Sequence, residues 1–296
     1  MEQAQWRELS LVVKAVCRRV RPLPRAQFSH FLIARLYFWA VWHGRPISSS
    51  VDPLHYNRLL RPRKLPSVSQ LNRRVAGPLF QQILQQVHER LSRRRDDAPA
   101  AALYVDGKPL PVSPVSGDRD ARWGHLGRGY KLHAVVTDRL DIPMFCVLPM
   151  NRHEMPVAQV MLERTPIEPG TLVMADGNYD AHALHKQVHA RGAWLITRPR
   201  LGGARRRVGG GHPVTRRQMG PARRALVDLW EKHPTLMRRV YTERVRVERV
   251  FGRLTCTPGL LGPLPSFVRG LARVHRWVGA KICLYHARLR AIEKRV

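Results

Sequence analysis

The sequence predicts an α/β protein in which a small all-helical region precedes a mixed sheet flanked by helices. Over about the first 95 residues, apolar side chains recur every three or four positions, as in WRELSLVVKAVCRRV and FSHFLIARLYFWAVW, which is the period of an amphipathic helix. From Leu103 onward the apolar runs are short, rich in β-branched residues and bounded by Gly or Pro, as strands are. Beyond Pro156, helical and strand patterns alternate, which favours a sheet covered by helices.

The helical region and the strand-bearing region are predicted to be separate domains. At 296 residues the chain is long enough for two, and the run RRRDDAP separates the two patterns, so the predicted domains are 1–97 and 98–296. In the first domain, LPSVSQLNRRVAGPLF has Ser67 as the expected N-cap of a short amphipathic helix that bears Arg73 and Arg74. That helix is expected either to enter a DNA groove or to expose the polar face of a helical bundle.

The second domain is expected to begin with an antiparallel meander. Its strands are ALYVDGKPLPV, YKLHAVVT and PMFCVLPM, separated by Gly or Pro. A helix over 156–164, the strand TLVMAD, a helix over 181–190 and the strand AWLITRP follow. Strands that are first antiparallel and then alternate with helices predict a mixed sheet.

Two basic segments complete the second domain. Residues 200–227 have no clear period, which predicts a mobile loop that grips phosphates without reading sequence through Arg205, Arg206 and Arg207. The last stretch, FVRGLARVHRWVGAKICLYHARLRAI, has helical period, so one face is expected in the core and the other toward solvent or DNA. The candidate contacts to the DNA backbone on this outer face are Arg269, Arg273, Arg276 and Lys281.

The chain is strongly basic, with 52 Lys plus Arg against 21 Asp plus Glu, a formal net charge of +31 and an isoelectric point near 11.5. Only eight of the 52 basic residues are Lys and the other 44 are Arg, whose planar guanidinium matches phosphate oxygens in a bidentate way. An Arg-rich proteome would account for the preference for Arg, but not for so large a net charge. The composition therefore predicts a nucleic-acid partner.

Three acidic residues stand out from this basic background. Asp106 and Asp176 each close an apolar run, in AALYVDG and TLVMADG, and Glu248 lies in a helical pattern, YTERVRVERVFGRL. Either aspartate could serve only as the first residue of an Asp-Gly turn, and Glu248 only as an ion-paired helix residue. Strand ends of α/β sheets are, however, where ligand-binding residues gather, and carboxylates suit Mg²⁺. Together the three residues predict a metal-dependent nuclease site.

Several other classes of protein are disfavoured. MEQAQWREL lacks the pattern of a secretory signal, and the most apolar stretch, FLIARLYFWAVW, is too short to span a membrane and is interrupted by Arg35, so an intracellular protein is expected. Four scattered cysteines without a CxxC pair indicate reduced thiols. His185 and His189 have the spacing of zinc-protease ligands without the accompanying Glu, so HKQVH is expected to be a solvated or packed helix face.

The three acidic residues belong to a longer series of motifs. In order, these are VDG, GRGYKLHAVVTDRLDIP, NRHE, ADGNYDAHAL and RVERVFGRL. With these motifs, the chain from Tyr104 to its end resembles the catalytic domain of bacterial insertion-sequence transposases of the DDE class. The most specific element is a signature of Tyr, two residues, Arg, three residues and Glu, which Tyr241, Arg244 and Glu248 match.

The resemblance implies a ribonuclease-H-like fold and cut-and-paste movement of the DNA element that encodes the protein. Asp106, Asp176 and Glu248 would hold two Mg²⁺ ions, for which Mn²⁺ would substitute. Water would cleave a phosphodiester at the element end, and the freed 3′-hydroxyl would attack target DNA. Tyr241 and Arg244 would lie on one helix with Glu248, facing the DNA end.

The implied partners are double-stranded DNA, as terminal inverted repeats and target, and a second copy of the chain when DNA is bound. The implied location is the bacterial cytoplasm, in association with the nucleoid.

The sequence departs from the family signature at one charged position. The signature continues with a Lys seven residues after the Glu, where this chain has Thr255, so Arg253 is the nearest basic substitute. Glu154 and His153, in NRHE, would either support the site or form an ordinary loop pair. A catalytically silent DNA-binding protein derived from a transposase is the alternative function, and a nuclease specific for branched DNA is a narrower one.

Overall fold

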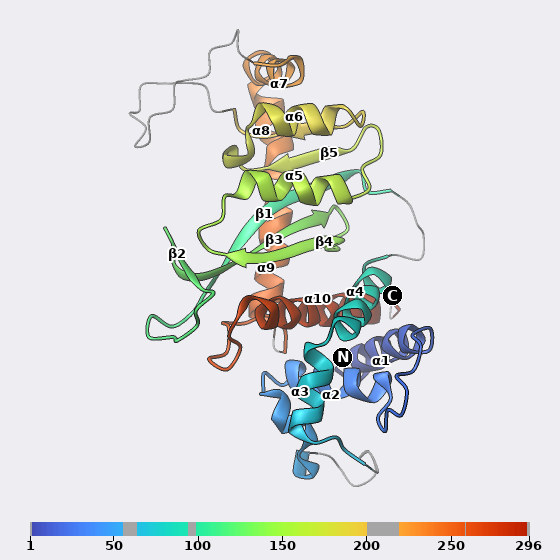
Figure 1. The fold of residues 1–296 in the computed structure, drawn as a ribbon. Helices are drawn as coiled ribbons and strands as arrows, with labels where there is room; N and C mark the ends of the chain where they lie inside the picture. The colour runs from blue at the N-terminus through green and yellow to red at the C-terminus, as the bar shows by residue number, and fades with distance from the viewer. Residues whose placement is uncertain (1, 56–63, 94–98, 200–218, 258, 295–296) are drawn as a thin grey trace. The chain divides into compact units, whose positions relative to one another are not determined.

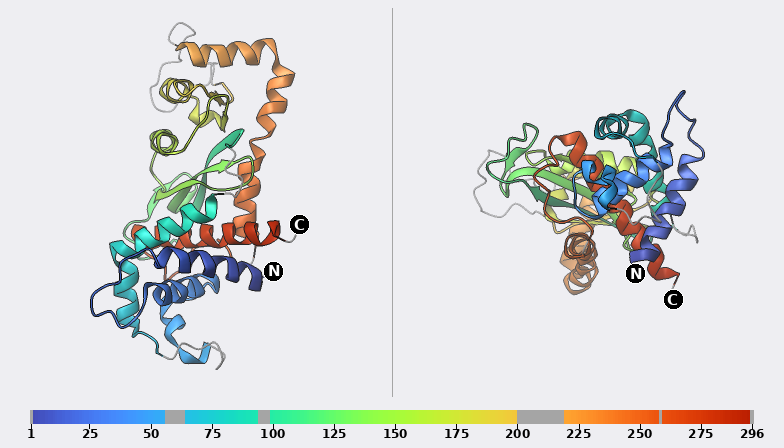
Figure 2. Two further views of the ribbon diagram at one scale, coloured as in Figure 1. Left: turned by 90° about the vertical axis from the view of Figure 1, so that its right-hand side faces the viewer. Right: turned by 90° about the horizontal axis from the view of Figure 1, so that it is seen from below.

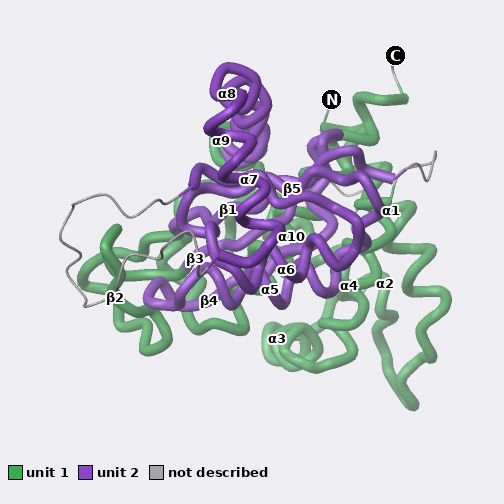
Figure 3. Tube along the Cα trace, turned by 90° about the horizontal axis from the view of Figure 1, so that it is seen from above, with its two compact units in different colours: residues 1–96, 110–130, 252–296 green, residues 97–109, 131–251 purple. Residues whose placement is uncertain are grey.

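The computed structural model describes residues 2–55, 64–93, 99–199, 219–257 and 259–294 (Figure 1). The chain forms two compact units, each built from segments that are distant in sequence (Figure 3). The first unit contains residues 1–96, 110–130 and 252–296, and the second contains 97–109 and 131–251. The domain boundary after residue 97 remains a prediction.

The first unit is mainly helical, as expected for the N-terminal region. Its helices are α1 (Glu2–Cys17), α2 (His30–Trp42), η1 (Ile47–Val51), η2 (Pro53–His55), α3 (Val68–Ala76), α4 (Pro78–Ser92) and α10 (Leu271–Glu293). Helix α10 packs against both α1 and α4, and Figure 2 shows α1 and α10 side by side. Leu9, Val13 and Val87 are among the buried residues of these helices.

Helix α3 begins where the sequence predicts it. The Ser67 hydroxyl accepts a hydrogen bond from the Gln70 amide at 3.2 Å, and the Gln70 side chain accepts one from the Ser67 amide at 2.9 Å. This reciprocal pair is a capping box, which satisfies two backbone donors at the helix start. The predicted N-cap is therefore confirmed.

Helix α10 differs from its expected orientation at one residue. Lys281, predicted on the outer face, is only 3% exposed and donates from Nζ to the Gly259 carbonyl at 2.8 Å. Burial lowers the pKa of Lys281 to about 8. Lys281 is separated from Trp277 by one helical turn and lies over its ring, so it packs with the core residues of the helix.

The sheet is mixed, as predicted. Its strands are β1 (Ala102–Pro111), β2 (Arg122–Gly124), β3 (Gly127–Thr137), β4 (Met144–Pro149), β5 (Leu172–Ala175) and β6 (Trp194–Ile196). The order is β2-β3-β1-β5-β6, with β4 paired to β3, and β1, β5 and β6 are parallel. The short strand β2 was not expected; it pairs antiparallel to β3 through a turn in which Gly127 has φ +107°.

In the second unit, helices α5 (Glu154–Arg164) and α6 (His182–His189) cover one face of the sheet. Leu162 and Leu184 pack there against Leu103, Val135 and Val173 of the strands. Since successive strand residues point to opposite faces, Tyr104 faces away from this core. The short helix η3 (Gly177–Tyr179) follows β5.

Three further helices complete the chain between the sheet and α10. They are α7 (Pro221–Lys232), α8 (Pro234–Thr242) and α9 (Val245–Cys256). The predicted basic loop over 200–227 is therefore too long, because Gly220 caps α7 and Pro221 occupies its first turn, where the missing amide costs nothing. Its arginines Arg205, Arg206 and Arg207 lie outside the described residues.

Candidate active site

The two aspartates singled out by the sequence lie at neighbouring strands. In the parallel pair β1 and β5, Val105 is opposite Ala175, so Asp106 and Asp176 each follow the last paired residue. Residues 102–105 are buried and Asp106 is partly exposed, although β1 continues to Pro111. Neighbouring strands are about 4.8 Å apart, which places the two carboxylates at the same edge of the paired segment.

Asp106 lies in a setting that disfavours its charged form. Burial raises the pKa of Asp106 to about 6, and the carboxylates of Asp176 and Glu154 act in the same direction. The Gly107 amide, which donates to Oδ1 at 2.8 Å, and the guanidinium of Arg244 act against this shift. Asp106 is therefore a partly desolvated carboxylate close to two others, where a cation is favoured.

Asp176 is held by the turn that follows β5. Its Oδ1 accepts from the Asn178 amide at 2.6 Å, and its Oδ2 accepts from the Asn178 side chain at 3.0 Å. Asp176 thereby caps η3. Asp176 therefore forms the turn expected as one of its two roles, and it also follows the strand next to that of Asp106. Its role in catalysis remains a prediction.

Glu248 is linked to Asp106 by the guanidinium of Arg244. The Arg244 guanidinium donates to Glu248 Oε1 at 2.7 Å and to Asp106 Oδ2 at 3.3 Å. The side chains of Asp106 and Arg244 are about one-fifth exposed, whereas that of Glu248 is 53% exposed. One guanidinium thus links two of the three predicted carboxylates and is the cation that they share.

The three signature residues do not lie on one helix, contrary to expectation. Tyr241 belongs to α8 and Glu248 to α9, with Arg244 in a turn between them. The amides of Glu243, Arg244 and Val247 bond to carbonyls three residues earlier, so the helical path tightens and is interrupted at this point. The residues still converge, since the Arg244 guanidinium lies 5.8 Å from the centre of the Tyr241 ring.

A buried ion pair lies next to Asp106. Lys131 Nζ, on β3, donates to Glu154 Oε1 at 2.5 Å, and the two side chains are 7% and 19% exposed. A Cβ atom added at Gly107 would lie 2.9 Å from Lys131 Cδ and 3.2 Å from Glu154 Oε1. The pair therefore packs directly against the residue that follows Asp106. His153 is exposed at the start of α5 and forms no capping bond through its side chain.

Lys131 was missed by the sequence analysis, although a signal for it exists. It interrupts an otherwise buried strand, GYKLHAVV, and a buried lysine requires an acidic partner or a hydrogen-bond acceptor. The sequence does not identify that partner, because Glu154 is 23 residues away on a different element.

The other predicted DNA contacts lie on α3 and near the end of α9. Arg73 is exposed, whereas Arg74 donates to the Phe28 carbonyl at 3.2 Å and pairs with the His30 ring. Arg253 is exposed in the last turn of α9, and the Thr255 hydroxyl donates to the Gly252 carbonyl at 3.2 Å. DNA contact by Arg73, Arg74 and Arg253 remains a prediction.

His185 is a packed residue, one of the two environments expected for HKQVH. It is 2% exposed and contacts Asp180 Oδ1 through Nε2 at 3.0 Å, while His189 stacks edge-on with Trp194. Within the described part of the chain, no group of three His, Cys, Asp or Glu side chains is arranged to hold a metal ion. The carboxylates of the site suit a hard divalent ion by their chemistry, but here Arg244 is the cation between Asp106 and Glu248.

Comparison with known proteins gives a match over almost two thirds of the chain. A family model described as a transposase DDE domain matches residues 98–285. No curated protein matches the chain. The mixed sheet with its flanking helices is consistent with the ribonuclease-H-like fold expected for such a domain. Among the described helices, none is both long and apolar enough to cross a membrane.

Proposed function

Because the chain belongs to the family of transposase DDE domains, we propose that it cleaves and rejoins DNA strands at the ends of its own mobile element. Asp106, Asp176 and Glu248 are the proposed catalytic carboxylates and ligands of two Mg²⁺ ions. The observation that carries this proposal is the placement of Asp106 and Asp176 after paired residues of neighbouring strands, with Glu248 tied to Asp106 by Arg244.

The chemistry that two divalent ions supply when bound is neutralisation of charge on the attacking and leaving oxygens of a phosphodiester. The chain's own residues would bind these ions and orient the three carboxylates. The strand register fixes Asp106 beside Asp176, and the Asn178 turn limits the rotamers of Asp176. Glu248 is the most exposed of the three and stands on a different element, so it is the ligand with the greatest freedom to adjust.

Arg244 has two tasks in this proposal. Without DNA it neutralises Asp106 and Glu248, which keeps the carboxylates close together despite their mutual repulsion. If the carboxylates held divalent ions, the Arg244 guanidinium would no longer be needed as their counterion, and its planar fork could bind a phosphate of the DNA end. Tyr241, whose ring lies below the Arg244 guanidinium and meets Trp230 edge-on, would hold the released side chain near the site.

We further propose that the substrate is DNA carrying the terminal inverted repeats of a bacterial insertion sequence, and that two copies of the chain pair the two ends. The net charge of +31 supports binding to this polyanion. A catalytically silent DNA-binding role is the second candidate. It is favoured by Thr255, which replaces a cationic signature residue and directs its hydroxyl to its own helix.

The decisive experiment uses labelled duplexes that carry the sequences flanking the gene, with Mg²⁺ or Mn²⁺. The parent should cut at the repeat boundary and join the freed end to a target duplex. Asp106→Asn, Asp176→Asn and Glu248→Gln keep the shape of each side chain and should lower the cleavage rate by at least about 100-fold, while DNA affinity is retained. Glu163→Gln, at an exposed glutamate of α5, is the matched control.

Two outcomes would count against this function. Tight binding without cutting under either metal would support the silent DNA-binding role. Cleavage that persists in all three carboxylate variants would show that the site lies elsewhere.

Metal binding can also be measured without DNA. Arg244→Gln removes the cation that competes for Asp106 and Glu248, so Mn²⁺ should bind about two- to fivefold more tightly by calorimetry, the range expected for partly exposed ion pairs. Arg246→Gln is the control, because Arg246 pairs with Glu243 and with none of the three carboxylates. Weaker Mn²⁺ binding by Arg244→Gln would contradict the proposed competition.

A further inference from the structure

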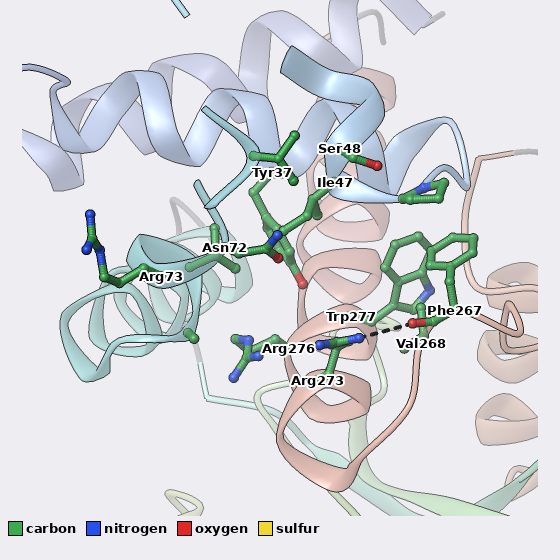
Figure 4. A pocket seen from close by; sticks show the side chains of 14 residues that line it. Tyr37, Ile47, Ser48, Asn72, Arg73, Phe267, Val268, Arg273, Arg276 and Trp277 are labelled. Atoms are coloured by element: carbon green, nitrogen blue, oxygen red, sulfur yellow. Dashed lines mark hydrogen bonds between the residues drawn. The ribbon is translucent and has the colours of Figure 1, made fainter. Parts of the chain in front are cut away.

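The first unit contains a cavity that plays no part in the candidate active site. Its volume is about 550 Å³, within the range of about 300–1,000 Å³ typical of small-ligand sites. The walls come from α2, η1, α3, the loop before α10 and the first turns of α10 (Figure 4). All of these elements belong to the first unit.

One wall of the cavity is aromatic and apolar. The rings of Phe267 and Trp277 meet edge-on, with centroids 5.6 Å apart, and Tyr37, one of the buried residues of α2, also lines the cavity. Val68, at the start of α3, is 41% exposed although it is apolar. Such a wall suits a flat, weakly polar group.

Another part of the cavity wall is cationic. Arg73, Arg273 and Arg276 all line the cavity, and none of the described residues that line it is acidic. Arg273 donates to the Phe267 carbonyl at 3.3 Å, and Figure 4 shows its guanidinium next to that of Arg276. Two like charges held together without a carboxylate destabilise each other unless an anion binds between them.

The side chain of Arg276 has one buried donor atom that is not hydrogen-bonded within the described structure. Its Nε is inaccessible to solvent and has no hydrogen-bond partner among the described residues. Burial lowers the pKa of Arg276, and the charge of Arg273 acts in the same direction. Leaving a buried charged donor unsatisfied is costly, so this position calls for an acceptor oxygen.

From these features we infer that the cavity binds one nucleotide unit, with the phosphate on Arg273 and Arg276 and the base against Trp277 and Phe267. Arginine forks bind phosphate oxygens in a bidentate way, and aromatic side chains stack on any base. Asn72, on α3, also lines the cavity and can contact polar edges of the base. A nucleotide is the chemical class that carries both the anion and the ring which these walls require.

Such a nucleotide has two sources, a free mononucleotide or an unpaired nucleotide of a DNA strand. The test distinguishes them with a free deoxynucleoside monophosphate, a fully paired duplex and the same duplex carrying one unpaired 2-aminopurine nucleotide. Binding is followed by 2-aminopurine fluorescence and by competition, in the presence of a chelator. Because no metal and no cleavage are involved, the result is independent of the proposed transposase activity.

Two variants test separately the charge of the arginines and the open volume of the cavity. Arg276→Gln with Arg273→Gln removes the phosphate site, whereas Ala76→Trp fills the cavity from an exposed position of α3 and leaves every arginine in place. Arg7→Gln, at an exposed arginine of α1 that does not line the cavity, controls for loss of net charge.

The parent and Arg7→Gln should bind the duplex with the unpaired nucleotide at least about fivefold more tightly than the paired duplex, the smallest effect expected for one stacked base. Both cavity variants should lose this preference. If the free mononucleotide binds the parent but not Ala76→Trp, and the duplexes do not differ, free nucleotides are the ligand class. Equal affinity of the parent for both duplexes, with no mononucleotide binding, would overturn the inference. So would an unchanged preference in Ala76→Trp.

Discussion

Asp180 is the centre of a buried charged cluster that connects the helices that follow β5. Its removal should be among the single changes that lower the stability of the second unit most. Its side chain is 0% exposed and those of Arg223 and His185 are 5% and 2% exposed. Arg223 donates to both carboxylate oxygens, at 2.9 Å from Nε and 2.7 Å from the terminal nitrogen. The cluster joins the end of η3 to α6 and α7.

The loss of folding free energy in Asp180→Ala follows from the charge of Arg223, which is left without its counterion. Arg223 would keep its charge in a site with almost no access to water, and breaking a buried pair by removing one partner costs about 3–5 kcal/mol. The double variant Asp180→Leu with Arg223→Met removes both charges and fills similar volume, so it should recover most of this cost. A cost of about 1–3 kcal/mol should remain, because the buried His185 ring loses its Asp180 partner. Glu163→Ala, on the exposed side of α5, should have little effect.

The measurement is hydrogen–deuterium exchange of the backbone amides of α6 and α7. Local exchange is preferable to global unfolding because the chain has two units and need not unfold in one step. A loss of about 3–5 kcal/mol raises the exchange rate roughly 100- to 5,000-fold, up to the limit set by the stability of the parent. An increase below about fivefold in Asp180→Ala would refute the assignment of Asp180 as the required counterion of Arg223.

Two further predictions concern backbone space and pH. Gly129→Ala would bring a Cβ atom to 2.3 Å from the Leu110 carbonyl, so the first unit should lose at least about 1–3 kcal/mol in denaturant unfolding, whereas Gly252→Ala, with no atom within 4 Å, should be neutral or slightly stabilising. Burial lowers the pKa of His133 to about 4 from 6.5. As the pH falls, the unfolded chain therefore takes up this proton at a higher pH than the folded chain does. The free energy of unfolding should keep its full value above pH 6.5 and decrease by about 3 kcal/mol toward pH 4. Unfolding titrations should show a shallower decrease for His133→Leu, and an identical pH profile would contradict the reasoning.

Much of the fold is encoded in local sequence. The helical period before residue 95, the β-branched runs from Leu103 and the capping pair of Ser67 and Gln70 all correspond to elements that the structure contains. These features depend on neighbours within a few residues, which is the range over which side-chain period and capping act. The neighbouring positions of Asp106 and Asp176 could also be expected, because both follow apolar runs that form adjacent parallel strands.

The errors have a common physical origin. The period of residues 241, 244 and 248 suits one helix, but bonds to carbonyls three residues earlier interrupt it at Arg244. Lys281 resembles an exposed lysine in the helical pattern, yet the Gly259 carbonyl, supplied by a different segment, accepts its hydrogen bond inside the core. In each case the deciding contact or backbone bond is not contained in the pattern from which the prediction was made.

The sequence by itself determined the family-specific motifs, the basic charge and the three carboxylates proposed to act in catalysis. Only the tertiary structure decided that Arg244 connects Asp106 to Glu248, that Lys131 pairs with Glu154 and that Asp180 pairs with Arg223. The partners of the Asp106, Lys131 and Asp180 pairs are 138, 23 and 43 residues apart. A buried charge requires a counterion or hydrogen-bond partner wherever the fold brings one near, and that choice depends on packing in three dimensions rather than on spacing along the chain.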